Sequence, residues 1–98
     1  MITPDTRCKR SDTIVHRQIG SEAILVPIRG DAVDLESIYT LNEVGRRIWH
    51  LLDGKRTVAQ LCRAIIAEFE VDEDAAQRDV QDFLEELIAL KAVEVCEA

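Results

Sequence analysis

The sequence contains few of the residues on which most catalytic and metal-binding sites depend. Among its 98 residues there are two histidines, His16 and His50. Neither lies at a spacing from other residues that is typical of a metal site or of a nucleophile and its base. The cysteines, Cys8, Cys62 and Cys96, include no CxxC pair, and the four glycines make no phosphate-binding loop. Cys62 is expected to pack as a small core hydrophobe, and the two cysteines near the chain ends are expected to be incidental. We therefore predict a protein that is not an enzyme and needs neither metal nor cofactor.

The sequence also lacks an excess of positive charge and any long apolar segment. Twelve lysines and arginines against 19 acidic residues give a formal net charge of −7, which opposes binding to nucleic-acid phosphates and to anionic lipids. No stretch approaches the ~20 apolar residues of a membrane span, and the N-terminus lacks the apolar run of a signal peptide. These features predict a cytoplasmic protein that binds neither nucleic acid nor membrane.

What the sequence does contain is enough apolar residues for one domain. Hydrophobic residues make up 47% of the chain, which at this length supports a single core. Residues 1–12 are expected to form a flexible N-terminal tail, and residues 13–98 a single domain. Within this domain, β-branched and apolar residues at 13–19 and 22–28 predict a hairpin, and 35–41 predicts a third strand.

A first helix is predicted after the third strand. Thr40 and Glu43 have the spacing of a capping box, apolar residues follow at helical intervals, and Gly54 is expected to end the helix. Gly45 lies inside this helix, where glycine costs about 1 kcal/mol relative to alanine. We expect it to permit a close approach of the helix to the sheet, and we expect Trp49, one turn later, at the border of the core.

Two further helices and a short strand complete the predicted order. Thr57 and Gln60 repeat the capping-box spacing, and an apolar stripe follows them. The third helix is predicted to begin at Asp72, whose carboxylate can cap free backbone N–H groups. Residues 93–95 predict a short final strand. Three strands followed by three helices indicate an α+β domain with a three-stranded antiparallel sheet.

Two binding functions fit this order of elements. One is a winged-helix DNA-binding transcriptional regulator, but its third helix would bring seven carboxylates toward the phosphates. They are Asp72, Glu73, Asp74, Asp79, Asp82, Glu85 and Glu86. The other function is peptide binding, in which an extended peptide adds to the open edge of the strand at 35–41. The same edge can pair with a second copy of the chain, which would give a homodimer.

Two stretches carry a resemblance to a known family. The segments "IYTLNEVGRRIWHLLDGKRTVAQL" and "DVQDFLEELIALKAV" resemble the PqqD-like family, also called RiPP recognition elements, where RiPPs are ribosomally made, post-translationally modified peptides. The resemblance runs from about Ile14 to Val95. Members of the pyrroloquinoline quinone pathway carry Pro-Glu after the second strand and a cysteine before the Asp-Gly pair. This chain has Ile28-Arg29 and Leu52 at those positions, so it is more similar to a relative that serves another peptide pathway.

The resemblance implies a winged helix-turn-helix-like domain that binds the leader segment of a precursor peptide. Members present that peptide to a modifying enzyme, often a radical S-adenosylmethionine (SAM) enzyme, and do not themselves catalyse the modification. In the family the leader adds to the third strand and lies in the groove between this strand and the third helix. The implied peptide-binding residues here are Leu35, Glu36, Ser37, Ile38, Tyr39 and Thr40 on the strand, and Ala76, Asp79, Val80 and Phe83 on the helix.

Overall fold

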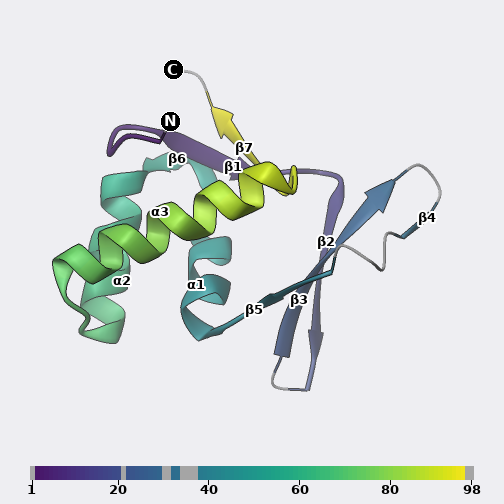
Figure 1. Cartoon of the computed structure of the whole chain (residues 1–98), viewed down its shortest axis with the longest axis horizontal. Helices are drawn as coiled ribbons and strands as arrows, with labels where there is room; N and C mark the ends of the chain where they lie inside the picture. Colours follow the sequence, from purple (N-terminus) through teal and green to yellow (C-terminus); the bar gives the residue numbers. More distant parts are fainter. Residues whose placement is uncertain (1, 21, 30–31, 34–37, 97–98) are drawn as a thin grey trace.

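Three helices pack together at one side of a small sheet, and strands from both ends of the chain lie against them (Figure 1). The computed structural model describes residues 2–20, 22–29, 32–33 and 38–96. The predicted α+β class, with antiparallel strands and three helices, is confirmed. Within the described residues, no helix is both long and apolar enough to cross a membrane.

One sheet is built from neighbouring segments of the chain. β2 (Ile14–Ile19) and β3 (Glu22–Arg29) form the expected antiparallel hairpin, which extends beyond the helices (Figure 1). The turn between them contains Gly20 at a φ of +61°, a conformation that glycine adopts without strain. The other edge of β3 pairs with β4 (Ala32–Val33) and with β5 (Tyr39–Leu41). The predicted third strand is therefore observed at its C-terminal end, and residues 34–37 lie outside the described part of the chain.

The other sheet joins segments that are far apart in the sequence. β1 (Arg7–Arg10) is its middle strand, with β6 (Asp53–Thr57) on one side and β7 (Val93–Cys96) on the other. The predicted final strand is thus observed, whereas β6 was not expected. The five residues of β6, DGKRT, include no large apolar side chain, so the period-two pattern that marks a strand is missing.

The N-terminal residues do not form the flexible tail expected for 1–12. Residues 7–10 form β1, and Cys8 is 1% exposed within the core. The backbone N–H groups of Val58 and Ala59 donate to the carbonyl oxygens of Thr6 and Pro4, over 2.9 and 3.0 Å. These N–H groups begin a helix and have no partner inside it, so the N-terminal segment stabilises that helix end.

α1 (Glu43–Leu51) begins and ends at residues other than those predicted. Its N-cap is Asn42, whose side-chain Oδ1 accepts a hydrogen bond from the N–H of Gly45 over 2.7 Å. Thr40 cannot form the expected capping box because it belongs to β5. The helix ends at Leu51, and Gly54 lies beyond it in β6 with a φ of +79°.

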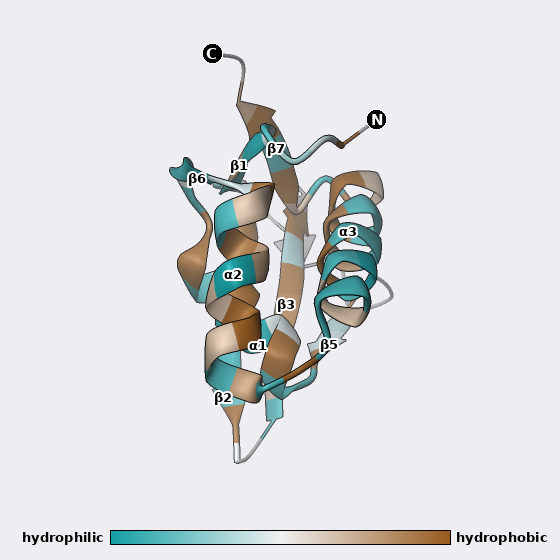
Figure 2. Ribbon diagram, turned by 90° about the vertical axis from the view of Figure 1, so that its left-hand side faces the viewer, coloured by the Kyte–Doolittle hydropathy of each residue, from teal (hydrophilic) through white to brown (hydrophobic). Residues whose placement is uncertain are grey.

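The other two helices follow the sequence signals closely. α2 (Val58–Phe69) starts with the predicted capping box, in which Thr57 and Gln60 exchange side-chain to backbone hydrogen bonds of 3.2 and 2.8 Å. α3 (Glu73–Ala89) starts after Asp72 as predicted, although the Asp72 side chain makes no capping hydrogen bond. Figure 2 shows apolar residues of both helices turned toward each other and the hydrophilic residues of α3 on its outer side.

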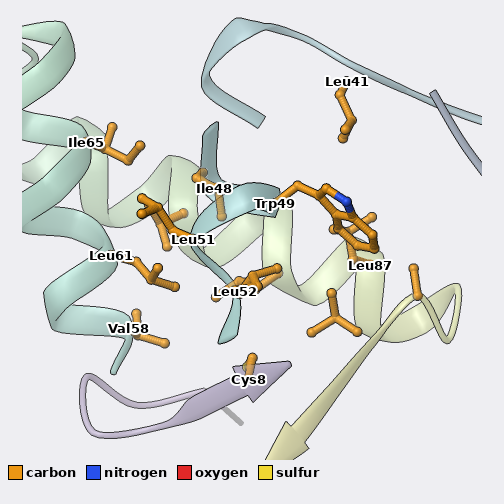
Figure 3. Packing of buried hydrophobic residues seen from close by; sticks show 14 of the residues in the cluster. Cys8, Leu41, Ile48, Trp49, Leu51, Leu52, Val58, Leu61, Ile65 and Leu87 are labelled. Carbon is orange, nitrogen blue, oxygen red and sulfur yellow. The ribbon is translucent and has the colours of Figure 1, made fainter. Parts of the chain in front are cut away.

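The core collects buried side chains from both sheets and all three helices (Figure 3). Cys62 is buried in it, as predicted, and so is Cys8, which was expected to be incidental. Trp49 is 3% exposed and is a full core residue rather than a border residue. The largest side chains with at most 2% exposure are Leu25, Ile48, Leu52, Leu61, Ile65, Leu84 and Leu87. Burial of core side chains from both sheets and from all three helices holds the strands and helices in one unit.

Candidate functional site

The backbone of β5 is open on one side. β5 pairs with β3 through Tyr39, Thr40 and Leu41, and no strand in the described part of the chain pairs with its other side. The side chain of Thr40 is exposed, and Ile38, just before the strand, is 41% exposed. An edge strand of this kind presents unpaired backbone N–H and C=O groups that can bind another extended chain.

A recess of about 270 Å³ lies beside this edge, between β5, the start of α1 and the outer side of α3. Its floor and walls come from residues 39–48, which include β5 and the start of α1, and from residues 79–86 of α3. The lining residues are Tyr39, Asn42, Val44, Gly45, Ile48, Asp79, Asp82, Phe83 and Glu86. The fold therefore places an open strand edge and a recess of mixed apolar and acidic character side by side.

Tyr39 connects the strand to α3. Its hydroxyl group donates a hydrogen bond of 2.5 Å to Oε2 of Glu86, and its ring meets the ring of Phe83 edge-on, with the centroids 6.2 Å apart. Burial raises the pKa of Tyr39 to about 12, with further contributions from this hydrogen bond and from the Glu86 charge. The protonated hydroxyl group holds the Glu86 carboxylate at the rim of the recess through this hydrogen bond.

Gly45 sets the distance between α1 and α3 at the bottom of the recess. A Cβ atom at this position would lie 2.9 Å from Cε1 of Phe83 and 3.2 Å from Oδ1 of Asn42. The close approach expected of Gly45 exists, but its partner is the Phe83 ring of α3 and not the sheet. The missing side chain lets the ring lie against the backbone of α1, which offsets the helix-propensity cost of glycine.

The rim of the recess is negatively charged. Asp79, Asp82 and Glu86 follow one another at intervals of three and four residues, so they share one side of α3. No lysine or arginine lines the recess, and none of these three carboxylates forms an ion pair within the described residues. Like charges at this spacing repel one another, so the rim attracts a positively charged group.

The structure places the predicted site residues in four different situations. Tyr39, Asp79 and Phe83 come together around the recess, and Ile38 and Thr40 lie exposed along the strand edge. Leu35, Glu36 and Ser37 lie outside the described residues. Ala76 and Val80 are 0% exposed, so neither can form a groove wall; they point from α3 toward the protein interior.

Six lining residues were not among those predicted, namely Asn42, Val44, Gly45, Ile48, Asp82 and Glu86. A sequence signal for two of them exists, because residues three and seven positions after Asp79 lie on the same side of a helix. Starting from Asp79, this spacing leads to Asp82 and Glu86. The contribution of the other four, which are the N-cap and three residues of α1, depends on how α1 packs against α3, which no local pattern encodes.

The two histidines form a separate pair, away from the recess. The rings of His16 and His50 meet edge-on with centroids 5.3 Å apart. Burial lowers the pKa of His50, and the nearby charges of His16, Arg10, Arg46 and Arg47 lower it further. No group of three or more His, Cys, Asp or Glu side chains within the described residues is arranged to hold a metal ion. The recess beside β5 therefore remains the candidate site.

Comparisons with known proteins identify the family. The family described as Coenzyme PQQ synthesis protein D (PqqD) matches residues 22–93, which is most of the chain. The structure of TbiB1 in complex with the TbiA(beta) leader peptide is similar to this one, with a TM-score of 0.71 and 32% sequence identity, over 88% of this chain and 94% of that chain. No curated protein matches the sequence significantly. The chain belongs to the PqqD family, as its sequence resemblance indicated.

Proposed function

We propose that this protein is a non-catalytic peptide chaperone that binds the leader segment of a ribosomally made precursor peptide and presents it to a modifying enzyme. The observation that carries the proposal is an open strand edge, β5, in a chain that matches a solved structure containing a leader peptide. Backbone hydrogen bonds to such an edge supply affinity, and neighbouring side-chain pockets supply selectivity. The recess beside Tyr39 lies where such a pocket is needed.

The bound peptide would extend the sheet as a strand next to β5. Its backbone would pair with residues 38–41, and its side chains would alternate between the recess and the opposite face of the sheet. Asp79 and Phe83 of α3 would contact it, whereas the buried Ala76 and Val80 would only support the helix. Leu35, Glu36 and Ser37 remain part of the proposed receiving strand.

The DNA-binding alternative has no support in this structure. The exposed side of α3 carries Asp79, Asp82 and Glu86. In a winged-helix regulator the corresponding helix enters the major groove of DNA, where these carboxylates would be repelled by the phosphates. Neither comparison points to a nucleic acid. The charge of α3 instead suits a neutral or basic peptide.

The proposal includes a second partner and a location. The modifying enzyme is of the radical SAM class in the systems that the family resemblance implies, and the complex would form in the cytoplasm, where ribosomes make the precursor. A pull-down of the enzyme with and without precursor peptide distinguishes a peptide chaperone from a purely structural subunit. A homodimer paired through β5 would occupy the same edge, so peptide binding should dissociate it.

The strand-addition proposal is tested with peptides selected from a random display library on the immobilised protein. Titration of the isotope-labelled protein with a selected peptide should shift the amide resonances of residues 38–41 and of the outer side of α3. Replacement of Tyr39 or Thr40 by proline removes one backbone donor each, and alternation directs only one of the two donors toward the peptide. We expect the proline variant whose missing N–H group would face the peptide to lose most of its affinity for the peptide. Failure to select any peptide, or shifts confined to other strands, would contradict the proposed function.

A further inference from the structure

We infer that the recess beside β5 accepts a long basic side chain, lysine or arginine, from the bound peptide. The inference rests on the proposed function, because the peptide must first dock along β5. It goes further by assigning a chemical class to one position of the ligand. Three independent properties of the recess lead to it: the charge of its rim, the character of its interior and its place beside the strand edge.

The charge of the rim selects a cation. Asp79, Asp82 and Glu86 converge on a recess to whose lining the described part of the chain contributes no basic side chain. Within the described residues, no ion pair neutralises any of the three, although Arg47 and Arg56 do pair with carboxylates elsewhere on the surface. A basic group at the rim would relieve the repulsion between these like charges on one helix side.

The interior of the recess suits the stem of such a side chain. Val44 and Ile48 of α1 and the Phe83 ring provide apolar walls, against which the methylene groups of lysine or arginine can pack while the charged head stays at the rim. Tyr39 and Phe83 also line the recess, and aromatic rings attract cations that approach their faces. A short acidic or polar side chain would make none of these contacts.

Gly45 and Tyr39 keep the recess open and its rim in place. Any side chain at position 45 would enter the space beside Phe83, since even a Cβ atom would lie 2.9 Å from that ring. The hydrogen bond from the Tyr39 hydroxyl fixes the Glu86 carboxylate at one end of the rim. Both features act before a ligand binds, so the site is preorganised for a cation.

The position of the recess defines where in the peptide the basic residue would occur. Tyr39 belongs both to β5 and to the lining of the recess, so an added strand passes directly beside it. Side chains of a strand alternate between two faces. Only every second residue of the peptide can therefore point toward the recess, and a basic residue should recur at one fixed position of aligned ligands.

The experiment compares peptide selections on three proteins. A random peptide display library is panned against the wild type, against Asp82→Lys, and against the control Glu85→Lys. Glu85 is exposed on the same helix but does not line the recess. Because both substitutions replace an acidic residue with lysine, the control changes the net charge by the same amount. Thermal unfolding verifies that all three proteins are folded. A selected peptide is then resynthesised with norleucine in place of lysine, which keeps the stem and removes the charge.

We expect the wild type and Glu85→Lys to enrich a basic residue at one position, and Asp82→Lys to lose that enrichment. The norleucine exchange should weaken binding to the wild type about five- to tenfold, the range of a partly exposed charge contact, and should have little effect on Asp82→Lys. Peptides that shift the amides of residues 38–41 but show no basic preference would overturn the pocket assignment and leave the proposed function intact. If no peptide binds at all, both proposals fail.

Discussion

The two sheets of this protein differ in how far their strands lie apart in the sequence. β2, β3 and β5 fall within residues 14–41 and include one tight hairpin. β6, β1 and β7 come from the middle and from both ends of the chain, with Arg7 opposite Thr57 on one side and Cys96 on the other. The local sheet carries the open edge of the candidate site, whereas the non-local sheet closes the core beneath the helices. Both sheets contribute to the core, but the candidate binding edge belongs to the local sheet.

The largest expected effect comes from breaking the non-local sheet with Cys8→Asp. Cys8 is 1% exposed in its middle strand, and an unpaired buried charge is strongly destabilising. We expect the free energy of unfolding, measured with urea, to fall by more than about 3 kcal/mol. The neighbouring change Lys9→Ala, at a side chain that is 57% exposed, should stay within about 0.5 kcal/mol. Equal effects of the two substitutions would contradict the role of β1 in the core.

A smaller effect is expected at the contact between α1 and α3, beside the edge of the local sheet. Gly45→Leu forces a side chain against Phe83, and overpacking of this kind costs about 1–3 kcal/mol. The same substitution should cost less in a Phe83→Ala background, where the ring is absent. A double-mutant cycle by urea unfolding measures the difference. An equal cost in both backgrounds would show that the α1 and α3 contact does not limit position 45.

The smallest effect concerns the hydrogen bond between Tyr39 and Glu86. Tyr39 is the only tyrosine, so its ionisation can be followed by ultraviolet absorbance. Its pKa is raised from 10.0 to about 12 in the folded protein, which means that its stabilising contribution is present below about pH 10 and is lost as the pH rises toward 12. Glu86→Gln should lower the Tyr39 pKa part of the way, because burial, the largest cause, remains.

At neutral pH, Glu86→Gln should change the free energy of unfolding by less than about 1 kcal/mol, since the amide oxygen still accepts a hydrogen bond. Asp74→Asn, at the distant start of α3, is the matched control for the loss of one negative charge. Identical tyrosine titrations of the wild type and Glu86→Gln would show that the hydrogen bond does not determine the ionisation of Tyr39.

The elements that could be predicted from the sequence are those with local signals. The hairpin follows from two β-rich segments around a turn, and α2 follows from the capping box of Thr57 and Gln60 ahead of an apolar stripe. β1 and β6 carry no such signal, because their residues, RCKR and DGKRT, are mostly polar. They become strands through pairing with distant segments, which a local pattern cannot encode.

The candidate site divides in the same way. Its strand and the acidic side of α3 could be predicted, and Tyr39, Asp79 and Phe83 do line one recess. The sequence alone does not distinguish the recess side of α3 from its buried side, so the predicted site includes Ala76 and Val80, which are buried. The contribution of α1 required the packing of Gly45 against Phe83, a contact between residues 38 positions apart in the sequence.

The pairing of β1 with β7 has a consequence for synthesis of the protein. Arg7 pairs with Cys96 and Arg10 with Val93. β1 therefore cannot pair with β7 until nearly the whole described chain has left the ribosome. The hairpin and helices can form earlier, because their contacts are local. During that interval β1 lacks its partner β7 and is held by β6 and by the hydrogen bonds between the N-terminal segment and the start of α2. Nascent chains stalled before residue 93 should therefore be more sensitive to proteases than chains released at full length.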